Sequence, residues 1–241
     1  PPIGSGTLGR DDALVETFLA LMPDRIRGAL ELRHPPCPDV EVVFARGTFE
    51  APDVGFAGRA IVDALRGKLG DKNVDVYAVN YPASLDFQRA ADGIVDASRK
   101  VEQTAATCPS TKIVIGGFSQ GAAVVSYLTA DSVPANFVLP DGITAPIPDD
   151  VAEHVTAGTL FGKPSSGFIN TVQSTVPPIN IGHPYTDRTV DLCIETDPVC
   201  SPTGGDGRAT TCTRPTAWSN RPPTTSPRES WRGQHGRHTE G

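Results

Sequence analysis

The pentapeptide from Gly117 to Gly121, Gly-Phe-Ser-Gln-Gly, places a serine between two glycines in the pattern G-x-S-x-G. It follows an apolar run at 112–116, and a small-residue segment typical of a helix extends over 119–129. A serine on such a strand-to-helix turn needs small neighbours, because a Cβ on either flank would collide with the strand or the helix. The turn would lift the Ser119 hydroxyl above a sheet, and the helix N-terminus would offer N–H groups to a developing oxyanion. The pattern predicts nucleophilic attack on an acyl carbon; the alternative is an ordinary glycine-rich turn.

The elements that would position this serine alternate along the chain. Five apolar or β-rich segments are typical of strands, at 40–45, 74–79, 112–116, 155–161 and 189–194. Segments typical of helices separate the first strands, at 56–69, 86–106 and 119–129. This alternation favours an α/β fold, a parallel sheet with helices on both faces. Ligands bind beyond the carboxyl ends of such strands, which points to Thr48, Ser119 and the loop after Ile194.

Several other classes of function lack their usual signals. The first strand is not followed by G-x-G-x-x-G, and the P-loop pattern G-x-x-x-x-G-K-[ST] is absent, so neither nucleotide motif is available. A formal net charge of −7 argues against nucleic-acid binding. The sequence has no apolar run of about 18 residues, the length of a transmembrane helix. The cysteines lack zinc-type C-x-x-C spacing, so we expect no metal site.

The composition changes near residue 200. Residues 201–241 contain six Arg, no Val, Ile, Leu, Met, Phe or Tyr, and a net charge of +3. A segment without aliphatic side chains cannot bury enough surface to offset its ordering entropy, so composition favours a disordered basic tail. We divide the chain into an N-terminal extension at 1–35, an α/β domain at 36–208 and a disordered or out-of-frame tail at 209–241. Within the extension, 11–22 is typical of a short amphipathic helix and lacks the features of a signal peptide.

Five segments together make the chain resemble the cutinases, most closely the secreted bacterial cutinase-like esterases. They are FARGT at 44–48, YAVNYPAS at 77–84, GFSQG at 117–121, FGKPSSGF at 161–168 and the C-x-x-x-D-x-x-C loop at 193–200. The resemblance covers about residues 36–208. It implies an α/β-hydrolase-type, cutinase-like three-layer sandwich with a central, mainly parallel sheet. It also implies a lid-less serine esterase with the chain order Ser, Asp, His, an ester or lipid substrate, no cofactor and a monomeric state.

The resemblance assigns the nucleophile and the oxyanion hole. Ser119 would be the nucleophile, and the backbone N–H of Gln120 would form half of the oxyanion hole. Thr48 matches the hydroxyl-bearing oxyanion residue of the family, and its N–H and hydroxyl would supply the rest. The alternative for Thr48 is a plain turn residue at the end of the first strand.

The candidate acid lies in a loop that two cysteines close. Cys193 and Cys200 flank the sequence Ile-Glu-Thr-Asp-Pro-Val, and the resemblance makes Asp197 the acid of the triad. A short disulfide loop would hold this carboxylate where it can orient a histidine and stabilise the imidazolium. Glu195 and Asp191 are nearby rivals, and Asp197 could instead serve only to form the turn before the following proline.

The chain has five cysteines, an odd number. The family pairs the positions of Cys37 and Cys108, and the loop cysteines Cys193 and Cys200 would form the second bridge. Two disulfides imply an oxidising compartment, so we expect a secreted protein. Cys212 is left without an expected partner.

No histidine stands where the family has one. The family places it shortly after the acid loop, in a segment like A-H-x-x-Y followed by N-G-M-V, whereas residues 209–213 read Ala-Thr-Thr-Cys-Thr. Three of the five histidines precede the candidate acid and two follow it in the arginine-rich tail; these are His34, His154 and His183, then His235 and His238. Whether His235 or His238 completes a triad stays open.

Codon degeneracy offers a reason for the missing histidine. In a shifted frame, the codons permitted for 209–219 can spell A-H-x-[MLV]-Y-x-x-N-G-M-V, the family's histidine segment in place and in order. We therefore hypothesise a frameshift near residues 207–209 that replaced the histidine and the final helix. Cys212 would then mark out-of-frame sequence and would not be a reactive thiol.

The sequence thus predicts a secreted serine carboxylic ester hydrolase, impaired in this chain because the histidine segment is missing. Its substrates would be cutin-like polyesters, short- to medium-chain acyl esters or lipids, with the choice made in loops near 81–88 and 164–184. A catalytically inactive protein of the same fold that binds a lipid or a glycan is the main alternative. An antigen-like secreted protein without chemistry is a third possibility.

Overall fold

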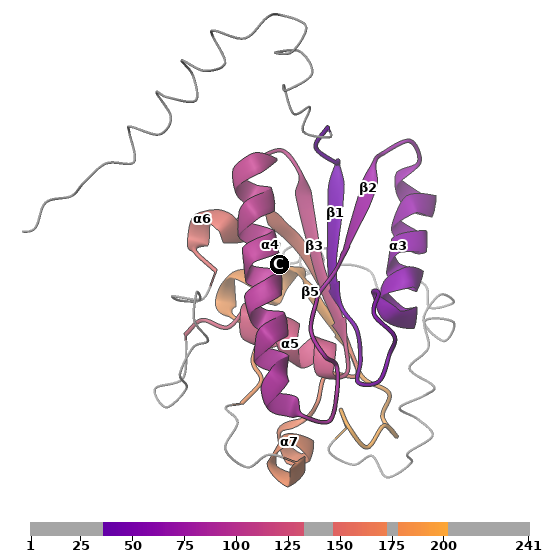
Figure 1. Ribbon diagram of the computed structural model, residues 1–241, viewed down its shortest axis with the longest axis vertical. Coiled ribbons are helices and arrows are strands. Elements are labelled where there is room, and N and C mark those ends of the chain that lie inside the picture. The colour runs from indigo at the N-terminus through magenta and orange to yellow at the C-terminus, as the bar shows by residue number, and fades with distance from the viewer. Residues whose placement is uncertain (1–35, 133–146, 173–177, 202–241) are drawn as a thin grey trace, which may run out of the picture. The chain divides into compact units, whose positions relative to one another are not determined.

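The computed structural model describes residues 36–132, 147–172 and 178–201. Within the unit Pro38–Gly241, the described strands form one parallel sheet in the order β2-β1-β3-β4-β5 (Figure 1). They are β1 Val40–Ala45, β2 Val74–Ala78, β3 Lys112–Phe118, β4 Val155–Phe161 and β5 Thr189–Leu192. All five predicted strands are confirmed, although the second ends at Ala78, the third continues to Phe118 and the fifth ends at Leu192.

The sequences of the two central strands, β1 and β3, are apolar almost throughout because of where these strands lie in the sheet. β1 lies between β2 and β3, with Val43 opposite Ile115 of β3. Both faces of these strands are covered, so nearly all their residues are buried, as in other parallel sheets. Because the strands run in the same direction, their carboxyl ends meet at one edge, where Ala45 lies beside Gly117.

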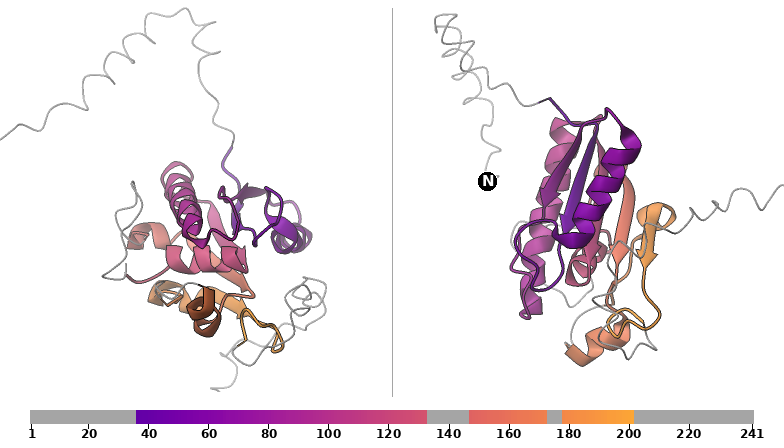
Figure 2. Two further views of the ribbon diagram at one scale, coloured as in Figure 1. Left: turned by 60° about the horizontal axis from the view of Figure 1, so that its bottom comes forward. Right: turned by 90° about the vertical axis from the view of Figure 1, so that its right-hand side faces the viewer.

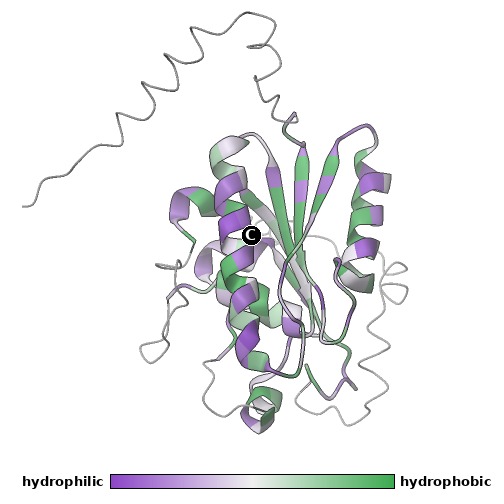
Figure 3. Ribbon diagram, in the orientation of Figure 1, coloured by the Kyte–Doolittle hydropathy of each residue, from purple (hydrophilic) through white to green (hydrophobic). Residues whose placement is uncertain are grey.

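Helices cover both faces of the sheet (Figure 1, Figure 2). α3 (Gly55–Leu69) covers one face, and α4 (Ala90–Thr107) and α5 (Gln120–Leu128) cover the other. Side chains alternate along β1, so Val42 joins the apolar cluster under α3 while Val43 joins the cluster under α4 and α5. Figure 3 shows mostly apolar strands between helices of mixed polarity. The three-layer α/β-hydrolase-type sandwich is therefore confirmed.

The structure also contains short helices that the sequence analysis did not predict. They are α6 at Asp149–Ala152, α7 at Ser166–Val172 and the 3₁₀ helix η2 at His183–Arg188. The predicted helix at 86–106 is divided into the 3₁₀ helix η1 at Phe87–Arg89 and α4. Helices this short contain too few turns to show an apolar period. The predicted helix at 11–22 lies outside the described residues.

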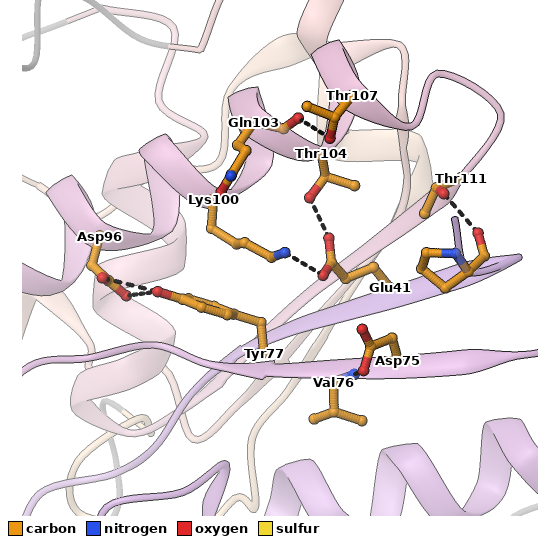
Figure 4. A network of polar contacts seen from close by, with 11 residues as sticks. Glu41, Asp75, Val76, Tyr77, Asp96, Lys100, Gln103, Thr104, Thr107 and Thr111 are labelled. Carbon is orange, nitrogen blue, oxygen red and sulfur yellow. Dashed lines mark hydrogen bonds and ion pairs between the residues drawn. The ribbon is translucent and has the colours of Figure 1, made fainter. Parts of the chain in front are cut away.

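A polar network fixes α4 to the two strands beneath it (Figure 4). Glu41 of β1 is only 2% exposed, and the Lys100 ammonium of α4 lies 2.6 Å from its carboxylate. Thr104, one turn further along α4, donates its hydroxyl to the same carboxylate. Lys100 also lies over the ring of Tyr77 in β2, and the Tyr77 hydroxyl donates to Asp96 at 3.0 Å. The buried charge of Glu41 is therefore paired and hydrogen-bonded by α4.

Replacing Lys100 by Met should lower the free energy of unfolding by about 3 kcal/mol, because it leaves the Glu41 carboxylate buried without its cation. Urea unfolding of the full chain measures this loss. The double variant Lys100→Met, Glu41→Leu should recover most of it, since the buried charge is then also removed. Lys72→Met breaks an exposed pair with Asp39 and serves as the matched control, with little expected change. Equal losses for Lys100→Met and Lys72→Met would show that the network does not stabilise the fold.

Candidate active site

β3 passes into α5 through Ser119, at the turn that the sequence predicts. Ser119 has φ 52° and ψ −115°, in a region of positive φ that is uncommon for residues with a side chain. Its N–H donates to the carbonyl oxygen of Phe161 at 2.9 Å, and its own carbonyl accepts the N–H of Ala122 at 3.0 Å. Backbone contacts on both sides thus hold Ser119 in a conformation of higher energy, which is a common feature of functional sites.

The two glycines beside this turn are required by close backbone contacts. A Cβ on Gly117 would lie 2.2 Å from the carbonyl oxygen of Gly121. A Cβ on Gly121 would lie 2.0 Å from the carbonyl oxygen of Ala45, at the end of β1. The steric reason given for the G-x-S-x-G pattern is therefore confirmed: without side chains at 117 and 121, α5 can start directly against the sheet.

Ser119 lines a cavity of about 590 Å³ beyond the carboxyl ends of the strands. Apolar side chains from η1, α4 and α7 form much of its wall, including Phe87, Ala90, Ile94, Phe168 and Val172. None of the described lining residues is Asp, Glu, Lys, Arg or His. Phe49 and Leu85 also line the cavity, yet they are 74% and 63% exposed and therefore reach solvent. The cavity can accept an apolar group and hold it beside the serine hydroxyl.

The two candidate oxyanion residues lie in the same cavity. Thr48 and Gln120 line it together with Ser119, and the Thr48 hydroxyl is 3.5 Å from Oε1 of Gln120. The buried Gln120 side chain donates from Nε2 to the carbonyl of Ser84 at 3.0 Å, so it links the turn to a second loop. Within the described part of the chain, the backbone N–H groups of Thr48 and Gln120 have no hydrogen-bond acceptor. Both amides are therefore available to a negatively charged oxygen.

Asp197 is the one buried residue among the three candidate acids. Its side chain is fully buried, and Oδ1 accepts the N–H of Val199 at 2.8 Å. Glu195 and Asp191 are exposed, and Asp191 lies 3.1 Å from the ammonium of Lys163. Val199, two positions after Asp197, lines the cavity, so the acid loop borders the space that Ser119 faces.

The cysteine loop around this acid is closed in the structure. Cys193 and Cys200 form a disulfide, with their Cα atoms 5.8 Å apart. Cys37 and Cys108 are also disulfide-bonded. The fifth cysteine, Cys212, lies outside the described residues.

Neither described histidine is placed beside Ser119. His154 and His183 are absent from the described lining of the cavity. His183 lies at the start of η2, where its N–H donates to Asp131. His34, His235 and His238 lie outside the described residues. Over the described ranges there is also no group of three or more metal-ligating side chains, and no helix long and apolar enough to cross a membrane.

Sequence reasoning missed the two residues that support the loop after β1. Arg46 is buried and donates to the backbone carbonyls of Glu50, Val79 and Tyr81. The Glu50 carboxylate accepts backbone N–H groups from its own loop and from α3. One signal could have indicated them: two charged residues, Arg46 and Glu50, flank a short segment that directly follows the mainly apolar strand β1.

A parallel sheet with a serine at a strained strand-to-helix turn, set between two glycines above an apolar cavity, defines an α/β hydrolase. The sequence model of the family described as Cutinase matches residues 36–211. This chain belongs to the cutinase family of serine ester hydrolases, as the motifs predict.

Known relatives agree with this assignment. A probable carboxylesterase of Mycobacterium tuberculosis, Culp5, is 50% identical over 148 residues, which cover 61% of this chain and 82% of that protein. The carboxylesterase Culp1 of Mycobacterium bovis is 42% identical over 193 residues, covering 80% and 81%. A solved acetylxylan esterase has a similar fold, with a TM-score of 0.60, 22% identity, and coverage of 76% of this chain and 94% of that one.

Proposed function

We propose that this site belongs to a secreted esterase with a Ser-His-Asp mechanism, and that the present chain is impaired because its histidine segment is missing. The observation that carries the proposal is the position of Ser119, with Thr48 and Gln120, in a cavity whose described lining is uncharged and mainly apolar. An acyl chain in the cavity would place an ester carbonyl beside the serine hydroxyl and the two unused amides. We infer that the substrates are accessible esters with short- to medium-length acyl chains.

The reaction would follow the acyl-enzyme route. The Ser119 oxygen attacks the ester carbonyl carbon while a histidine takes the hydroxyl proton, and the carbonyl oxygen becomes an oxyanion. The N–H groups of Gln120 and Thr48, with the Thr48 hydroxyl, would stabilise that oxyanion. Collapse breaks the carbon–oxygen bond to the alcohol, which leaves with the proton from histidine. Water then repeats the sequence on the acyl-serine, releasing the acid and restoring Ser119, with Asp197 orienting the histidine throughout.

Impairment follows from the absence of a general base at the family position. A serine hydroxyl is a weak nucleophile without an adjacent base. The family match ends at residue 211, close to the proposed frameshift at 207–209. This end point supports a domain at 36–208 followed by an out-of-frame tail. Secretion is supported by the disulfide between Cys193 and Cys200, which needs an oxidising compartment.

The unaltered chain should hydrolyse p-nitrophenyl butyrate at nearly the background rate, and Ser119→Ala should change that rate little. The reason is that general acid–base catalysis typically supplies about 10²–10⁴ of the acceleration. Release of p-nitrophenol over time measures the rate. If the unaltered chain is already fast, and if replacing His235 and His238 by Ala abolishes the rate, the tail supplies the base and the frameshift account is wrong.

The second candidate function is binding without hydrolysis. It is favoured because neither His154 nor His183 is among the described residues that line the cavity, while the apolar side chains that would hold a ligand are present. Such a protein would retain a lipid or a glycan ester without cleaving it. The test is to incubate the ligand for a long time with the unaltered chain and with a chain whose histidine has been restored. Recovery of unchanged ligand from both would favour binding over ester hydrolysis.

A further inference from the structure

The backbone N–H groups of the loop after β1 differ in whether they have a hydrogen-bond acceptor. The N–H of Gly47 donates to the Glu50 carboxylate at 2.6 Å, and that of Phe49 donates to the carbonyl of Ala83 at 2.7 Å. The N–H of Glu50 donates to the carbonyl of Gly47 at 3.2 Å. From Gly47 to Glu50, the N–H of Thr48 alone has no acceptor among the described residues. The hydrogen bonds around it therefore determine where this one amide points.

The Glu50 carboxylate joins this loop to the start of α3. One oxygen accepts the N–H of Gly47, and the other accepts the N–H of Phe56 at 2.9 Å, in the first turn of the helix. Gly55 makes room for it: a Cβ there would lie 2.4 Å from a Glu50 carboxylate oxygen. A carboxylate is also favoured at this position, because a helix N-terminus attracts negative charge. Glu50 thus connects a rigid element to the residue directly before Thr48.

Arg46 holds the loop from the other side. Its guanidinium donates to the carbonyl of Glu50 at 3.0 Å and to the carbonyl of Tyr81. The buried Tyr81 hydroxyl donates back to the carbonyl of Arg46. Burial raises the pKa of Tyr81 well above its usual value, so the phenol remains a neutral donor. Phe49, held between these contacts, has a φ of 66°, a strained value for a bulky residue.

We propose that Glu50 is a positioning residue of the oxyanion site, which holds the Gly47 N–H so that the Thr48 N–H faces the cavity. The inference rests on the proposed function. It adds a role for a carboxylate that would not touch the substrate. A negative charge near an oxyanion would by itself oppose the reaction, so its benefit must come from the geometry that it imposes on the loop.

Octanoate binding to the full chain tests the proposal without requiring turnover. One carboxylate oxygen of octanoate stands for the oxyanion, and octanol carries the same alkyl chain without the charge. In the unaltered chain, octanoate but not octanol should move the Thr48 amide-proton resonance downfield. In Glu50→Gln, the Kd of octanoate should rise about tenfold while that of octanol stays nearly constant.

The sign of this effect separates positioning from simple electrostatics. Glu50→Gln removes a negative charge, so Coulomb interaction alone would make octanoate bind more tightly. Gly55→Ala is the second variant, because its Cβ displaces the carboxylate while the charge remains. It should weaken octanoate binding as Glu50→Gln does. Gly70→Ala is the matched control: Gly70 ends the same helix with a similar φ of 60°, and a Cβ there has nothing within 4 Å.

Three results would overturn the proposal. They are tighter octanoate binding in Glu50→Gln, an equal loss of octanoate and octanol, and no octanoate-specific response at Thr48 in the unaltered chain. Failure of the proposed function is a different result. If a chain with restored histidine stays inactive but keeps its preference for octanoate in a Glu50-dependent way, the esterase is rejected and the role of Glu50 in anion binding stands.

Discussion

Consider a variant in which the sequence from residue 209 onward is replaced by the translation of the shifted frame, with histidine at position 210. This variant is expected to hydrolyse p-nitrophenyl butyrate about 10²–10⁴ times faster than the unaltered chain. The histidine would supply the base that Ser119 lacks, and the restored final helix would carry it. The cavity and the Ser119 turn form in the present chain, so the variant needs no other change. Initial rates of p-nitrophenol release at equal protein concentration give the ratio.

Two controls isolate the contribution of the histidine. The same shifted reading with alanine at 210 restores the helix without the base, and it should remain near background. Ser119→Ala in the active variant should also return the rate to background, because the acyl group would have no acceptor. If the histidine-bearing variant folds but stays inactive, the frameshift account fails and the binding function is preferred.

Gly121→Ala is expected to lower the free energy of unfolding by about 3 kcal/mol or more, near the upper end of overpacking effects. The added Cβ would lie 2.0 Å from the Ala45 carbonyl oxygen, which is a backbone atom of the central strand. To relieve the clash, β1 and α5 must separate, and the Ser119 turn lies at that junction. Urea unfolding followed by circular dichroism measures the loss.

Gly67→Ala is the matched control for this substitution. Gly67 lies in α3, and a Cβ there has no atom within 4 Å. The same chemical change should therefore stabilise the protein by about 1 kcal/mol, because alanine is the better helix former. If Gly121→Ala unfolds at the same urea concentration as the parent chain, the close packing of α5 against β1 described above is wrong.

The Ser119 turn and the sheet could be predicted because their sequence signals are local or strongly periodic. The apolar run at 113–116 is typical of a buried strand, and the glycines at 117 and 121 indicate a close backbone contact that a side chain would prevent. The burial of Asp197 is consistent with its selection over Glu195, but that choice came from the resemblance.

The support of the loop after β1 could not be predicted in the same way. Glu50 acts through N–H groups at 47 and 56, and Arg46 acts through carbonyls at 79 and 81. Such side-chain-to-backbone bonds depend on how the loop crosses the end of the sheet, and they leave no period in the sequence. The seven-residue helix α7 was missed for a related reason, since its residues repeat over too few turns.

The described residues that line the cavity carry no charge, and this has a consequence for how the protein binds a ligand. Burial raises the pKa of Tyr127, the phenol in the wall, to about 12. No other described lining side chain is acidic or basic, so the wall presents the same surface to a neutral ester from mildly acidic to mildly alkaline solution. Recognition of such a ligand should be nearly independent of pH and ionic strength. A titration curve recorded on a restored enzyme would then report the proton transfers of the reaction and not the binding of its substrate.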